Sequence, residues 1–152
     1  MRIYIDTSVI NGLYVEDAIW IKEITKNFFK ESIEKHHKLY ISNIVADEIR
    51  RTPDPSKRKK LLKVVKNFGC IELTKTQGAE ILANKYVDRK IIPRKCLADA
   101  LHIAIASLHK IPILVSWNFR HIVRHKTRIG INSVNKKYNY MQIDICSPEE
   151  VG

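Results

Sequence analysis

The chain has 152 residues, 45% of them hydrophobic, which predicts one globular domain over residues 1–152 and excludes a disordered polymer. No apolar run approaches the roughly 20 residues that a bilayer-spanning helix needs, and the N-terminus does not show the pattern of a signal peptide. The 27 basic and 16 acidic residues give a net charge of +11, which favours a polyanionic partner. Nucleic acid is the first candidate and an anionic membrane surface the second, while solubility alone is the plain alternative.

The cysteines are three in number, Cys70, Cys96 and Cys146, and no two have the C-x-x-C spacing. This usage indicates buried thiols in a reducing compartment. We therefore expect a cytoplasmic protein without a disulfide framework or a zinc knuckle.

Strand-like and helix-like segments alternate in the first half of the chain. A short buried strand at 3–5 precedes one or two helical turns at 9–14, and Asp17 is expected to cap a long helix that ends near residue 38. A second strand at 39–41 then leads into a helix that Ser42 caps and that ends near Arg51, because Pro53 follows.

The alternation continues in the second half. A helix opened by Asp54 and Pro55 precedes a strand at 70–73, and Thr76 caps a helix to about residue 89. The segment 97–108 is apolar almost all round and predicts a buried helix.

The last part of the chain predicts a strand at 111–115, a short helix ending near Arg124, a polar basic segment, a strand around 142–145 and a helical start at Ser147. Alternating strands and helices favour βαβ units. The predicted fold class is therefore α/β, with a central parallel sheet of four to five strands.

Three acidic residues occupy positions where a charge is costly. Asp6 follows the first strand directly, where an open α/β sheet binds ligands, although it can equally cap the next helix. Glu48 shares a helical face with Ile44 and Val45, and its alternative is an ion pair with a neighbouring arginine. Asp99 lies near the start of the apolar helix, where the helix N-terminus alone would favour it.

These acids would lie together at the edge where parallel strands end. Like charges repel unless a divalent cation neutralises them, and an all-oxygen ligand set favours Mg²⁺ or Mn²⁺ over zinc. Asn118, after the fourth strand, offers a further oxygen ligand, or simply turn chemistry. His102, one helical turn after Asp99, orients that acid, touches a phosphate, or is a hydrogen-bonded core histidine.

The motifs that contain these residues resemble the PIN domain, especially the single-domain VapC-type toxins of prokaryotic toxin–antitoxin pairs. The resemblance covers nearly the whole chain and rests on four short motifs in order: Ile3 to Val9, Ser42 with Glu48, Asp99 to Ala104, and Leu114 to Asn118. It implies an α/β/α sandwich and a metal-dependent ribonuclease.

The resemblance also implies roles for single residues. Asp6, Glu48 and Asp99 would hold Mg²⁺ or Mn²⁺, and Ser8, rather than Thr7, would help to hold water or metal. The fourth family position is usually Asp but here is Asn118, so one negative charge is lost and a second metal ion would bind more weakly.

Basic residues adjoin each of these motifs and suit an RNA backbone. Those expected to contact the substrate, besides His102, are Arg50, Arg94, Lys95, Arg120 and Arg124. The resemblance further implies an acidic antitoxin partner, a homodimer and no membrane.

Two other functions compete with a ribonuclease. If Asn118 in place of the usual Asp has removed the activity, the protein is a catalytically weak RNA-binding or regulatory PIN module. A haloacid-dehalogenase-type phosphatase also begins with an Asp after a first strand, but it needs a second Asp where this chain has Ser8.

Overall fold

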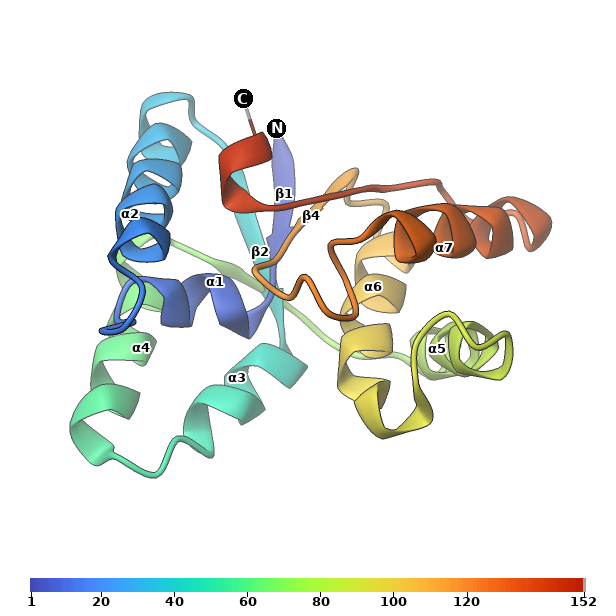
Figure 1. Ribbon diagram of the computed structural model, residues 1–152, viewed down its shortest axis with the longest axis horizontal. Coiled ribbons are helices and arrows are strands. Elements are labelled where there is room, and N and C mark those ends of the chain that lie inside the picture. The colour runs from blue at the N-terminus through green and yellow to red at the C-terminus, as the bar shows by residue number, and fades with distance from the viewer. Residues whose placement is uncertain (152) are drawn as a thin grey trace.

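The protein is built on a five-stranded sheet in which every neighbouring pair of strands is parallel, as the sequence predicts (Figure 1). The computed structural model describes residues 1–151. The strand order is β3-β2-β1-β4-β5, with bounds β1 (Arg2–Ile5), β2 (Lys38–Ser42), β3 (Ile71–Leu73), β4 (Ile113–Val115) and β5 (Asp144–Cys146). Because all strands run the same way, their carboxyl ends meet at one edge of the sheet.

Helices cover both faces of the sheet, which confirms the predicted α/β/α arrangement. Figure 1 shows α1 (Thr7–Gly12), α2 (Ile19–Glu34) and α4 (Pro55–Asn67) on one side of the sheet. The other side carries α5 (Gln77–Asp88), α6 (Leu97–Leu108) and α7 (His125–Lys137). The short helix α3 (Asn43–Arg50) follows β2 and lies with α1 at the edge where the strands end.

The core forms where β1 meets α6. Ile3 and Ile5 of the central strand are fully buried. Every residue of α6 from Ala100 to Ser107 is buried, which confirms the helix at the predicted bounds and its burial on most sides. A rigid central strand and a buried helix together fix the positions of the residues at the carboxyl edge.

Helix caps follow the sequence with one exception. Ser42, Asp54 and Thr76 each accept a backbone N–H at the start of their helices, as predicted. The expectation for Asp17 is wrong: α2 begins at Ile19, and its N-cap is Ala18, which makes no side-chain hydrogen bond. The helix also ends at Glu34, before the predicted end, because the chain must turn into β2.

The segment after Asn118 is the main error in the predicted elements. Residues 119–124 form turns and bends and no helix. Val123 also donates to the Asn118 carbonyl, so the helical bond that Ile122 makes to that carbonyl is not continued. The basic segment that follows is not irregular but forms α7. Its buried face includes the polar residues Thr127 and Asn135, so the periodic spacing of hydrophobic residues that indicates a helix is weak in this segment.

The remaining predictions concern the C-terminus, the cysteines and the membrane. Ser147 forms a capping box and starts a 3-10 turn over Pro148–Glu150. All three cysteines are free thiols. No helix within residues 1–151 is both long enough and apolar enough to cross a membrane.

Candidate active site

Asp6 lies at the carboxyl end of β1, where its buried side chain is held by hydroxyl groups. Ser8 Oγ donates to its Oδ1 and Ser116 Oγ donates to its Oδ2, each at 2.5 Å. Oδ1 also accepts the backbone N–H of Val9 at 3.3 Å, so Asp6 caps α1 as well. Capping therefore uses one oxygen of the carboxylate, and the two serines fix the orientation of both.

The ends of β1 and β4 are joined through these serines. Ser8 Oγ accepts the backbone N–H of Trp117 at 2.9 Å, and Ser116 Oγ accepts that of Asn118 at the same distance. Ser116 lies inside the motif Leu114 to Asn118, in which only Asn118 was assigned a role from the sequence. The sequence did contain a sign of its role, because Ser116 is a hydroxyl residue directly after the strand that pairs with β1.

Glu48 is held by a buried relay of polar side chains. Its Oε1 lies 2.9 Å from His102 Nε2, and His102 Nδ1 lies 2.7 Å from the hydroxyl of Tyr4. The Tyr4 hydroxyl is in turn 2.7 Å from Ser42 Oγ. His102 thus bonds Glu48 and not Asp99. Because it is only 2% exposed, it occupies the core rather than the surface that a phosphate would reach. The alternative of a hydrogen-bonded core histidine therefore describes it.

Asn118 uses both ends of its amide within the protein. Its Nδ2 donates to Asp99 Oδ2 at 3.2 Å, while its Oδ1 accepts the backbone N–H groups of Arg120 and His121 at 3.1 and 2.9 Å. These two acceptances fix which end of the amide is oxygen. The turn chemistry expected as the alternative is therefore present, and the Asn118 oxygen is already occupied.

The carboxylates influence one another although Glu48 is hydrogen-bonded to His102. Burial is the largest cause of the raised pKa of Asp99, and the charges of Asp6 and Glu48 raise it further. Burial likewise raises the pKa of Asp6, in spite of the hydroxyls that bond it. Burial also opposes the ionisation of Glu48, but its hydrogen bond to His102 and the charge of that ring outweigh burial and lower the pKa.

The residues present suit a hard cation in their chemistry. All donors are oxygens, and the like charges of Asp6, Glu48 and Asp99 are what a divalent cation would neutralise. Thr7 Oγ1 is buried and, among residues 1–151, makes no hydrogen bond of good geometry, although it lies near enough to Glu48 to help lower the pKa of that carboxyl. In this arrangement no three His, Cys, Asp or Glu side chains of the described chain converge closely enough to hold a metal ion, and the Glu48 carboxylate is hydrogen-bonded to His102.

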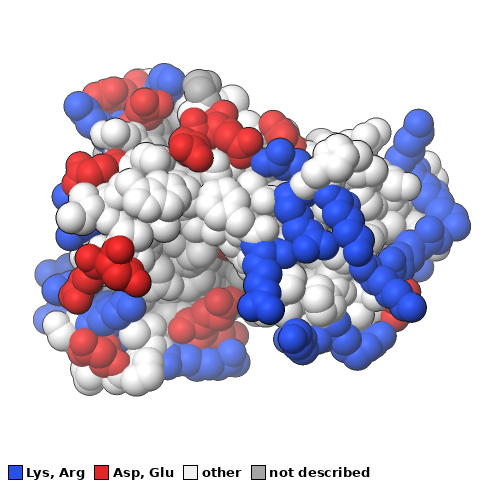
Figure 2. Space-filling model, viewed as in Figure 1, with Lys and Arg blue, Asp and Glu red and all other residues white. Residues whose placement is uncertain are grey.

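The basic residues predicted to contact substrate lie mainly on one half of the molecule. Figure 2 shows Lys and Arg gathered on the right, over α5, α6 and α7, and most of the visible Asp and Glu on the left. Arg94 pairs with Asp88 at 2.8 Å, whereas Lys95 and Arg120 are exposed and Arg124 donates to a backbone carbonyl. Arg50 pairs with Asp47 on α3 at 3.2 Å.

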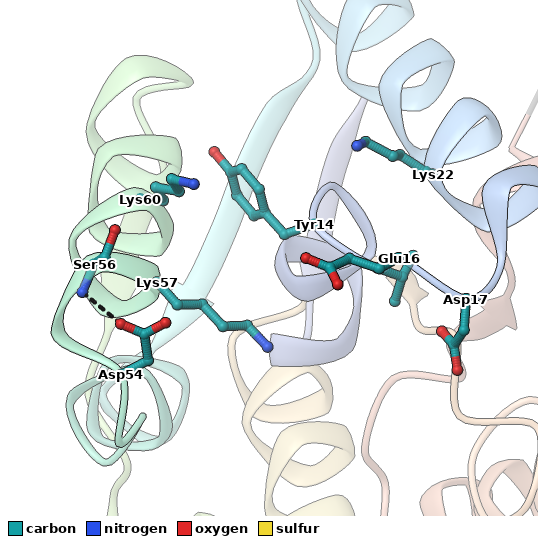
Figure 3. Close-up of a pocket in the computed structure, with 9 residues that line it drawn as sticks. Tyr14, Glu16, Asp17, Lys22, Asp54, Ser56, Lys57 and Lys60 are labelled. Atoms are coloured by element: carbon teal, nitrogen blue, oxygen red, sulfur yellow. Dashed lines mark hydrogen bonds between the residues drawn. The ribbon is translucent and has the colours of Figure 1, made fainter.

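A separate cavity of about 640 Å³ lies between α4 and the loop that joins α1 to α2 (Figure 3). Its lining mixes both charges, with Lys57 and Lys60 facing Tyr14 and Glu16 across the opening. None of the acids at the carboxyl edge is among the residues that line it. The cavity is therefore distinct from the candidate site.

The parallel sheet and its covering helices define a PIN-like α/β domain. No known protein family matches the sequence, and no curated protein matches it. By structure, the chain is similar to a chain of VapBC2 from Rickettsia felis, solved bound to a DNA fragment from their promoter. The TM-score is 0.60 at 13% sequence identity, over 97% of this chain and 98% of that chain. This likeness shows a shared fold and, at that level, confirms the resemblance to VapC-type PIN domains.

Proposed function

We propose that the protein is a metal-dependent endoribonuclease, the toxin of a toxin–antitoxin pair. The observation that carries this proposal is the placement of three carboxylates, Asp6, Glu48 and Asp99, at the ligand-binding edge of a PIN-like sheet, where the charges of Asp6 and Glu48 help to raise the pKa of Asp99. Burying like charges costs stability, so their arrangement favours a ligand that compensates for the cost. A divalent cation is the simplest such ligand.

Asp6 and Asp99 would hold the ion, and Glu48 is the third expected ligand. When bound, Mg²⁺ or Mn²⁺ would lower the pKa of a water molecule and polarise the scissile phosphate. Ser8 and Ser116 keep the oxygens of Asp6 oriented, and Asn118 does the same for Asp99. A carboxylate that is to accept the proton of the attacking water needs an oxygen without a hydrogen bond. Asp99 would meet this need, because within residues 1–151 it accepts a hydrogen bond only from Asn118, at Oδ2.

The charge distribution supports RNA as the substrate and an acidic protein as the partner. The basic half in Figure 2 suits a phosphate backbone. The same surface suits an acidic antitoxin, and the structurally similar chain belongs to the VapBC2 complex. We also propose a homodimer, which rests on the resemblance to VapC-type proteins alone.

The proposal is tested by incubating a mixed RNA pool with the protein in Mg²⁺, Mn²⁺ or EDTA. We expect cleavage that requires the metal and that falls by more than about a hundredfold in Asp99→Asn, because loss of a metal ligand exceeds the usual effect of an outer-sphere change. The matched control is Asp144→Asn, an exposed acid at the first residue of β5 and therefore at the opposite end of that strand from the site, which should leave cleavage unchanged. Cleavage that persists in EDTA or in Asp99→Asn would refute the proposal.

A second function is favoured by the contacts of Asn118. An amide that donates to Asp99 occupies the position where a further carboxylate would attract metal. A protein with these contacts can bind RNA and turn it over slowly or not at all. The Asn118→Asp variant distinguishes the two functions: a large gain in metal-dependent cleavage supports the RNA-binding module, whereas an already efficient wild type supports the nuclease.

A further inference from the structure

Three aromatic side chains form a continuous strip beside the acids. The ring centroids of Trp20 and Trp117 lie 5.7 Å apart with planes at 89°, and those of Trp117 and Phe119 lie 6.0 Å apart at 67°. Trp117 is only 9% exposed, whereas Trp20 is 55% exposed and Phe119 is 47% exposed. The two outer rings thus offer accessible surface on either side of a fixed central ring.

The central ring is held by packing and by a hydrogen bond. Trp117 Nε1 donates to Thr25 Oγ1 at 2.9 Å, which links the indole to α2. Gly12 allows α1 to approach this pair, because a Cβ there would lie 2.6 Å from Thr25 Oγ1 and 3.0 Å from Trp117 Nε1. A ring fixed in this way loses little conformational freedom when a ligand binds against the strip.

The strip adjoins the candidate active site through the backbone of residues 117–119. Trp117 donates its backbone N–H to Ser8, which bonds Asp6, and the next residue, Asn118, bonds Asp99. Phe119 follows directly. The rings of Trp117 and Phe119 are therefore carried by the same loop that helps to hold Asp6 and Asp99 in place.

We propose that Trp20, Trp117 and Phe119 form a stacking surface for unpaired bases of a single-stranded RNA whose backbone reaches the acids. This inference rests on the proposed function, and it names the substrate class as unpaired RNA. Aromatic side chains beside a basic groove are the usual means of holding single strands, because every base presents a π-face.

The charges at the two ends of the strip orient such a strand. Glu16 and Asp17 are exposed just before Trp20 and repel phosphate, whereas Arg120 is exposed just after Phe119. The backbone is therefore expected on the Phe119 side, toward the basic half in Figure 2, with bases turned toward Trp20.

Intrinsic fluorescence tests the inference directly, because the two tryptophans of the chain both belong to the strip. Short single-stranded RNA is titrated in EDTA, which measures binding without turnover, and an abasic ribose-phosphate strand of the same length is the comparison ligand. We expect RNA to quench the fluorescence and the abasic strand to bind at least about tenfold more weakly, the size of one base–aromatic stack.

The variants Trp20→Leu and Phe119→Leu keep an apolar side chain but remove the ring. Each should weaken RNA binding by about tenfold and leave abasic-strand binding unchanged. The matched control is Ile33→Ala, an exposed apolar residue near the far end of α2, which should bind RNA as the wild type does.

Equal binding of RNA and the abasic strand, or unchanged RNA binding in both ring variants, would overturn the inference. So would a concentration-dependent dimer in sedimentation that Trp20→Leu abolishes, because the strip would then contact a second copy of the chain. Base-dependent binding without any cleavage would retain the stacking surface and refute only the nuclease, so the two failures are distinguishable.

Discussion

Two groups of polar residues lie on the same helix, α6. One is buried and neutral and the other is partly buried and charged, and they differ in whether their hydrogen bonds and charges are balanced within the protein. Toward its C-terminus, Ser107 joins Tyr86 and Asn135 in a neutral network in which the Asn135 amide donates to Ser107 Oγ and to a backbone carbonyl, and its oxygen accepts from Tyr86. Toward its N-terminus, Asp99 and His102 belong to a charged group with repelling carboxylates. The hydrogen bonds of the neutral network are satisfied within the protein, which is typical of a structural role. For the charged group we propose stabilisation by a ligand, which is typical of a functional site.

The largest effect on stability should come from breaking the neutral network. Asn135→Leu removes the acceptor of the Tyr86 hydroxyl, which keeps only a 3.4 Å contact with Ser107 Oγ, and it removes the donor to the Met141 carbonyl. We therefore expect a loss of about 3 kcal/mol in the free energy of unfolding and a Tm lower by about 6 to 12 °C. Calorimetry in EDTA and in Mg²⁺ should give the same loss. A loss that depends on metal would contradict the separation of the two groups.

A smaller effect is expected where the charged group is supported by a neutral hydroxyl. Ser116→Ala removes the donor to Asp6 Oδ2 but leaves the carboxylate itself, so metal affinity should fall about tenfold, as for other groups that orient a ligand. Titration with Mn²⁺ measures this fall. Ser133→Ala, an exposed serine on α7, is the control and should bind Mn²⁺ unchanged.

Removing one repelling charge should have the opposite sign to breaking the neutral network. In EDTA, Asp99→Asn is expected to raise stability by about 1 kcal/mol, or about 2 to 4 °C in Tm, because it relieves Asp6 and Glu48 of a like charge. The same variant should lose the stabilisation that Mg²⁺ gives the wild type. A variant less stable than the wild type in EDTA would show that Asp99 is a structural acid.

The smallest expected effect is the pH dependence of stability without metal. The pKa values of Asp6 and Asp99 are raised in the folded protein, so these groups hold protons that the unfolded chain releases, and stability falls as pH rises above their ordinary value of 3.8. For His102, burial is offset by Glu48 and its raised pKa contributes stability that is present below 6.5 and lost as pH rises through the folded pKa. Tm in EDTA should therefore be higher at mildly acidic than at alkaline pH. In His102→Gln the part of the slope above pH 6.5 should disappear.

The same contrast explains what could be predicted from the sequence. The strands and α6 follow from local hydrophobic spacing, and Asp6 and Asp99 stand out because acids interrupt apolar segments. The missed helix α7 faces the core with Asn135, whose partners lie on α5 and α6 and cannot be recognised from neighbours in the chain.

The contacts of Glu48, His102 and Asn118 were equally hidden. His102 bonds Tyr4 and Glu48, which lie 98 and 54 residues away, so its helical spacing from Asp99 could not decide among the roles that the sequence left open. Asn118 was recognised as a departure from the resemblance, but its donation to Asp99 depends on how the loop after β4 folds. Residue types therefore identify the acids, and tertiary structure decides what each acid contacts.

The measurement that tests the charged site most directly is calorimetric titration of the wild type and Asp99→Asn with Mn²⁺. We expect saturable binding to the wild type, at a site made of Asp6, Asp99 and Glu48, and its loss in the variant. Absence of binding at millimolar Mn²⁺, or equal binding by the two proteins, would contradict a metal site at the carboxyl edge and with it the proposed ribonuclease.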